Sequence, residues 1–145
     1  MHFDFLIPVL YTDAEATFYD GVARHLERAG RTVALLTMTR KGERRLRASH
    51  PHVFYLYDGW TAPRVADPAD VSEIEQRYGI DCIADHVYAE SRYLSGMPTA
   101  RLIPRAVHTF RWLETFLATH TLSHFVNNIG GEVVRRSMAR MAESG

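Results

Sequence analysis

The chain has 145 residues, of which 46% are hydrophobic and 11% aromatic, and its 17 basic and 17 acidic side chains cancel at neutral pH. We expect residues 1–145 to form a single domain with a substantial core. The balanced charge argues against a nucleic-acid-binding surface, and no apolar run reaches the roughly 18 residues that a membrane span needs. A soluble cytoplasmic protein without a secretory leader is expected.

The chain begins with a strand that is expected to be buried on both faces, because residues 3–10 are almost continuously apolar. Thr12 and Glu15 form a capping box, which predicts that a helix begins near Asp13. Gly30 is expected to end this helix in a left-handed conformation. The residues predicted to face the core are Phe18, Val22, Leu26 and Ala29.

A second apolar strand at residues 32–38 completes a right-handed βαβ unit, whose ligands bind at the carboxyl ends of the strands. The candidate residues there are Tyr11, Thr12, Asp13, Glu15, Arg40 and Lys41. Residues 39–49 carry five basic side chains against one acid, Glu43, and are predicted to be helical. They form either a solvated charged face or an anion-binding patch.

The third strand is predicted at residues 53–57, with Asp58 and Trp60 just beyond its end. Trp60 either covers a ligand or caps the core. Asp70 and Glu73 form a second N-terminal box.

That box predicts a helix over residues 71–78, which Gly79 ends. Residues 80–84 are a candidate short strand, followed by Asp85 and His86. Cys82 is the one cysteine, which excludes a disulfide, and we expect it to be a small buried apolar side chain.

The last third of the chain contains the longest clear helix, over residues 103–120. A strand at 123–128, a tight turn through Gly130 and Gly131, and a closing helix at 132–143 follow. Alternating strands and helices predict the α/β class, as a Rossmann-like three-layer domain with a mainly parallel sheet.

Three segments of the sequence carry a resemblance to a known family. They are FYDGVARHLERAGRTVALLTMTR, VFYLYDGW and, near the end, HFVNNIGGEVVRRSMARMAESG. In this order they resemble the N-terminal domain of GT-B type glycosyltransferases of bacterial capsular and surface-polysaccharide biosynthesis. The resemblance implies an acceptor-side domain that binds a saccharide or lipid-linked saccharide. It also implies a nucleotide-sugar donor held by a further C-terminal domain, without which this chain is inactive.

Glycosyl transfer needs a base for the acceptor hydroxyl, or a polar group that holds it. Glu15 and Asp13 are the candidate catalytic residues, and Arg40 and Lys41 are expected to hold an anionic acceptor. The remaining candidate substrate-binding residues are Tyr11, Thr12, Asp58, Trp60, His86, Asn128, Gly130 and Gly131.

No cofactor or metal is expected. The sequence has neither a GxGxxG after the first strand nor a GxxxxGK[ST], and its histidine pairs are not spaced as ligands on one rigid face. Two alternatives remain open. One is a non-enzymatic receiver or flavodoxin-like domain that binds a ligand or partner, with Asp58 as the acceptor of a phosphoryl group, and the other is half of a sugar-nucleotide epimerase.

Overall fold

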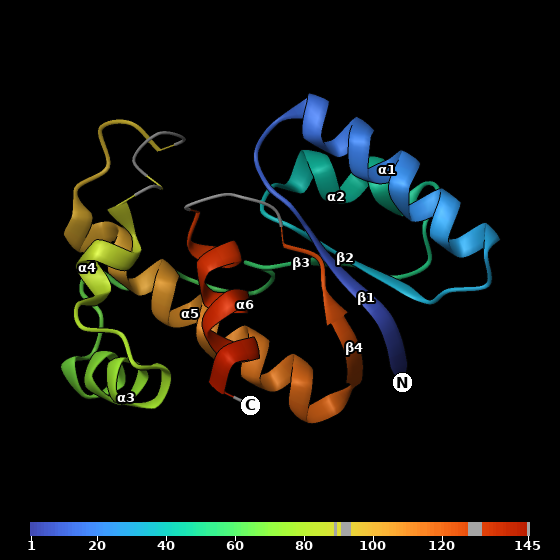
Figure 1. Cartoon of the computed structure of the whole chain (residues 1–145). Coiled ribbons are helices and arrows are strands. Elements are labelled where there is room, and N and C mark those ends of the chain that lie inside the picture. The colour runs from blue at the N-terminus through green and yellow to red at the C-terminus, as the bar shows by residue number, and fades with distance from the viewer. Residues whose placement is uncertain (89, 91–93, 128–131, 145) are drawn as a thin grey trace. The chain divides into compact units, whose positions relative to one another are not determined.

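The computed structural model describes residues 1–88, 90, 94–127 and 132–144. The chain divides into two compact units, and Figure 1 labels the helices and strands of each. The sheet unit consists of Met1–Trp60 and Leu117–Val126, and the helical unit consists of Thr61–Phe116 and Asn127–Gly145.

The described part of the sheet unit contains four parallel strands in the order β3-β2-β1-β4. Their bounds are β1 His2–Val9, β2 Val33–Thr37, β3 Val53–Tyr55 and β4 Thr121–Phe125. β1 pairs with β2 from Phe5 opposite Val33 to Val9 opposite Thr37. The predicted class, α/β and Rossmann-like with a parallel sheet, is confirmed.

The strand order also bears on the alternatives left open by the sequence. Flavodoxin-like and receiver domains have the order 2-1-3-4-5, in which the first and third strands are neighbours. Here β3 pairs with β2, and β1 lies between β2 and β4. This order matches the first four strands of the Rossmann order 3-2-1-4-5-6, and it argues against the receiver or flavodoxin-like alternative.

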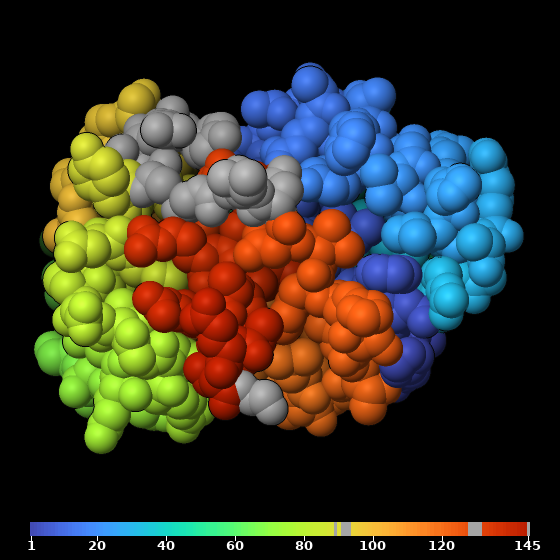
Figure 2. Space-filling model, in the orientation of Figure 1, coloured from blue at the N-terminus to red at the C-terminus, as the bar shows by residue number. Residues whose placement is uncertain are grey.

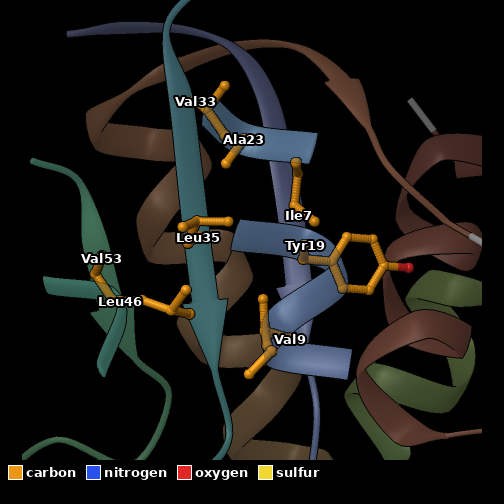
Figure 3. Packing of buried hydrophobic residues seen from close by; sticks show 9 residues of the cluster. Ile7, Val9, Tyr19, Ala23, Val33, Leu35, Leu46 and Val53 are labelled. Atoms are coloured by element: carbon orange, nitrogen blue, oxygen red, sulfur yellow. The ribbon is translucent and has the colours of Figure 1, made fainter. Parts of the chain in front are cut away.

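Two helices pack against the sheet within this unit: α1 (Asp13–Arg28) and α2 (Arg40–Arg47). In Figure 3 side chains from β1, β2 and α1 point toward one another. The buried residues of this core are Ile7, Val9, Ala16, Tyr19, Ala23, Val33, Leu35, Leu46 and Val53.

The predicted buried stripe of α1 is wrong in part. Phe18 is 63% exposed and Ala29 is exposed, whereas Val22 and Leu26 are half-buried at the margin of the core. The buried face is centred on Ala16, Tyr19 and Ala23. The predicted and the observed buried residues both have helical spacing, so spacing alone does not choose between them. The small alanines let the helix backbone approach the sheet closely, and the buried face is therefore rotated away from Phe18.

The ends of α1 follow the prediction. The Glu15 amide donates to Thr12 Oγ1 at 3.1 Å, and Gly30 adopts a φ of 77°. The helix is also tied to the loop after α2 through the buried ring of His50. Its two nitrogens each lie 2.9 Å from a carboxylate oxygen, of Asp20 and of Glu27.

The helical unit contains α3 (Pro68–Tyr78), α4 (Ile83–His86), α6 (Val133–Ser144) and most of α5 (Thr99–Thr119). In Figure 2 the surface of α6, in red, lies against the green and yellow surface that precedes α5. The core of this unit consists of Ile74, Tyr78, Ile80, Ile83, Val87, Leu102, Ala106, Phe110 and Val133.

Three expectations for this unit are wrong. Residues 80–84 form no strand, because a helical turn begins at Ile83. Cys82 precedes that turn and is exposed rather than buried. Helix α3 begins at Pro68 rather than at residue 71, and its cap is Asp67 rather than Asp70. The Asp67 carboxylate accepts the Ala69 amide at 2.9 Å.

Asp70 and Glu73, which the sequence places in a cap, instead bind Arg111 of α5, each at 2.7 Å. The Arg111 hydrogen bond also holds the pKa of Glu73 below its usual value. The two acids therefore join α3 to α5 rather than capping a helix. The cap lies three residues earlier because Pro68 is well suited to the first position of a helix.

Candidate functional site

A pocket of about 190 Å³ lies at the carboxyl edge of the sheet, where β1 and β2 end. Parallel strands bring these two ends to the same edge, which is where ligands of open α/β sheets bind. The residues that line the pocket are Val9, Leu10, Tyr11, Thr12, Asp13, Ala16, Thr39, Lys41 and Gly42.

The two helices that begin at the pocket are capped in the same way. Thr12 Oγ1 accepts the Glu15 amide at 3.1 Å, and Thr39 Oγ1 accepts the Gly42 amide at 3.0 Å. A Cβ on Gly42 would lie only 3.1 Å from Thr39 Oγ1, so glycine suits this close approach. The pocket wall is therefore made of strand ends, capping hydroxyls and the first turns of α1 and α2.

The charged groups of the pocket are Asp13 and Lys41, whose side chains meet at 2.6 Å. Both remain well exposed, at 64% and 72%. The hydrogen bond from Lys41 lowers the pKa of Asp13, so this carboxylate is ionised at neutral pH. A strongly ionised carboxylate is a good hydrogen-bond acceptor and a weak base.

Arg40, one residue before Lys41, points to the carboxyl end of β3. It donates to Asp58 Oδ1 at 2.6 Å and to Glu43 Oε2 at 2.7 Å, and its guanidinium lies 4.2 Å from the centre of the Tyr55 ring. The hydrogen bond to Glu43 raises the pKa of Arg40. Both cations that were expected to hold an anionic acceptor are thus already paired with carboxylates.

The structure brings most of the predicted site residues to this edge of the sheet unit. Tyr11, Thr12, Asp13 and Lys41 line the pocket. Glu15 is half-buried in the first turn of α1. Arg40, Asp58 and Trp60 lie at or after the neighbouring strand ends.

His86 belongs to the helical unit, where it is 2% exposed. Its Nε2 lies 3.1 Å from Ser137 Oγ, and its ring centre lies 5.4 Å from that of Phe110. Burial lowers the pKa of His86 to about 4, and the charges of Arg136 and Arg140 act in the same direction. Its contacts are those of a core residue. Asn128, Gly130 and Gly131 lie outside the described residues.

Sequence reasoning missed Thr39, Gly42, Tyr55 and Tyr57 as residues of this edge. Thr39 and Gly42 carried a usable signal, because a threonine directly after a strand and before a helical pattern predicts a cap. Tyr55 and Tyr57 were assigned to the third strand without regard to the face on which they lie.

In the part of the chain that the structure describes, no three His, Cys, Asp or Glu side chains come together as metal ligands. None of the described helices is long and apolar enough to cross a bilayer. Comparison of the chain with protein-family models, with curated proteins and with solved structures found no significant match.

Proposed function

We propose that this chain is the acceptor-side domain of a glycosyltransferase of capsular or surface-polysaccharide biosynthesis, and that the pocket beside Asp13 binds one sugar unit of the acceptor. The observation that carries the proposal is the paired carboxylate and ammonium of Asp13 and Lys41 at the mouth of a small pocket at the carboxyl edge of a parallel sheet. Together they offer a hydrogen-bond acceptor and a donor within 2.6 Å of each other.

Neighbouring hydroxyl groups of a sugar donate and accept hydrogen bonds at similar spacing, so they match this pair. The hydroxyls of Thr12 and Thr39 add further polar groups. The volume of 190 Å³ lies below the range of about 300–1,000 Å³ typical of sites for larger ligands, which favours a single ring.

In this proposal Asp13 accepts a hydrogen bond from the acceptor hydroxyl. The hydroxyl oxygen then bonds to the anomeric carbon of a nucleotide-sugar donor, which a further domain holds. The bond from that carbon to the nucleoside diphosphate breaks, and the hydroxyl proton passes to a carboxylate or to water. Glu15 is the second candidate for that carboxylate. Because nucleotide sugars are cytoplasmic, the proposal implies a cytoplasmic location.

A glycan array of bacterial capsular and lipopolysaccharide structures tests the proposal. We expect the chain to retain at least one glycan. Asp13→Asn removes a charge-assisted hydrogen bond and should weaken this binding about tenfold. The matched control is Asp81→Asn, which changes an exposed acid of the helical unit and should leave the binding unchanged.

Circular dichroism verifies that both variants fold, which is expected because both acids are exposed. An array on which the chain retains no glycan would overturn the proposal. Equal loss of binding in the Asp13 and Asp81 variants would place the saccharide elsewhere and would overturn the proposed role of the pocket.

A further inference from the structure

Three half-buried aromatic side chains lie at the carboxyl end of β3. The ring centres of Tyr55 and Tyr57 lie 5.9 Å apart, and those of Tyr57 and Trp60 lie 5.3 Å apart. We call Tyr55, Tyr57 and Trp60 the aromatic cluster. All three belong to the sheet unit.

Charged groups lie directly beside these rings. The Arg40 guanidinium stands 4.2 Å from the centre of the Tyr55 ring and holds Asp58 at 2.6 Å. The side chains of Arg40 and Asp58 are 52% and 67% exposed. An aromatic surface therefore adjoins one exposed donor and one exposed acceptor.

The aromatic cluster is also connected to the pocket. Arg40 and Lys41 are consecutive residues in the first turn of α2. Arg40 reaches toward Tyr55 and Asp58, while Lys41 reaches into the mouth of the pocket toward Asp13. Two consecutive residues of α2 therefore link the pocket to the aromatic cluster.

The chemistry of the aromatic cluster fits a sugar ring. A pyranose has an apolar face of C–H groups, which packs on an aromatic ring, and a rim of hydroxyl groups, which bind arginine and carboxylate side chains. Tryptophan and tyrosine supply such a face together with a polar group at the edge.

We infer that the aromatic cluster is a second saccharide subsite, and that the acceptor is a chain of at least two sugar units running from the pocket past Arg40 to Trp60. This inference rests on the proposed function. The pocket holds one unit, and the aromatic cluster binds the next unit along the chain.

Trp60 provides a direct probe, because the only other tryptophan is Trp112 in the helical unit. In a Trp112→Phe background, emission reports on Trp60 alone. The probes are galacturonic acid with its di- and tetrasaccharide, and glucose with maltose and maltotetraose. In at least one series we expect the disaccharide and the tetrasaccharide to bind about tenfold more tightly than the monosaccharide and to shift Trp60 emission to the blue.

The Trp60→Ala variant should lose the gain in affinity that the longer saccharides show, and it should keep the affinity for the monosaccharide. Calorimetry measures both affinities. Should that variant fail to fold, Asp58→Asn serves instead, since its side chain is 67% exposed and should lose part of the gain. Uridine monophosphate is tested alongside, because a nucleobase also stacks on tryptophan.

Each outcome has a distinct meaning. Monosaccharide binding with no gain from chain length, or a gain that survives Trp60→Ala, overturns the second subsite and leaves the proposed function standing. A Trp60 shift with uridine monophosphate and with none of the saccharides assigns the cluster to a nucleotide and overturns the inference. Absence of binding by all six saccharides, together with an array that retains no glycan, overturns both.

Discussion

Replacement of Phe110 by alanine should lower the free energy of unfolding by about 3–5 kcal/mol, the range found when a buried phenylalanine is truncated. Phe110 is fully buried in the core of the helical unit. Its ring stacks on Tyr78 with centres 4.7 Å apart, and lies 5.4 Å from the ring of His86. Truncation therefore removes contacts with α3 and α4 and leaves a cavity between them.

Urea denaturation followed by the emission of Trp112, in a Trp60→Phe background, measures this loss in the helical unit. The matched control is Phe18→Ala. Phe18 is 63% exposed on α1, so its truncation should change stability by no more than about 0.5 kcal/mol. Similar losses for the two variants would contradict the assignment of Phe110 to the core and of Phe18 to the surface.

The second large effect is a loss of stability in mild acid, caused by His86. Burial lowers the pKa of this histidine from 6.5 to about 4. The unfolded chain therefore binds a proton below pH 6.5 that the folded chain does not bind until about pH 4. The stability contributed by neutral His86 is full above pH 6.5, falls as the pH drops through this window, and reaches its lower limit below about pH 4. The total loss is about 3 kcal/mol.

Urea denaturation at intervals between pH 7 and pH 4 checks this dependence. His86→Gln removes the titrating group and should flatten the profile over the window, whereas His25→Gln, on the exposed surface of α1, should keep the slope. Carboxylates with lowered pKa values, such as Glu73, lose their contribution only below about pH 4.5. An unchanged slope in His86→Gln would show that another group causes the acid sensitivity.

Much of the sheet unit followed from the sequence because its signals are local. Continuous apolar runs predicted β1 and β2, and threonine caps and glycine stops predicted the ends of α1. The face of α1 was harder to predict. Phe18 and Tyr19 are adjacent aromatic residues, and only contact with the sheet decides that Tyr19 is buried.

The helical unit was less predictable, because its ends depend on contacts between distant residues. Asp70 and Glu73 have the spacing of a cap, but both bind Arg111, about forty residues later in the chain. Residues 80–84 are too short an apolar run to distinguish a strand from a helical turn. Here the Ile83 amide is held by Glu75 Oε1 at 2.8 Å, at the start of α4.

For the candidate site, the rule that ligands bind at the carboxyl ends of parallel strands was enough to find the edge of the sheet. Tyr11, Thr12, Asp13 and Lys41 do line one pocket there. The pairing of Asp13 with Lys41 and of Arg40 with Asp58 could not be predicted, because it depends on the register of β1, β2 and β3. His86 was a candidate because it follows residues 80–84, which were expected to form a strand; these residues form no strand, and His86 is buried beside Phe110 in the helical unit.

We propose that a saccharide binds at the mouth of the pocket beside Asp13. Amide chemical shifts of the ¹⁵N-labelled chain, recorded during a titration with the glycan that the array retains most strongly, test it most directly. We expect the largest shifts at Tyr11, Thr12, Asp13, Thr39 and Lys41, and we expect half-saturation of Asp13→Asn to require about ten times more glycan. Shifts confined to the helical unit, or a spectrum that the saccharide leaves unchanged, would contradict it.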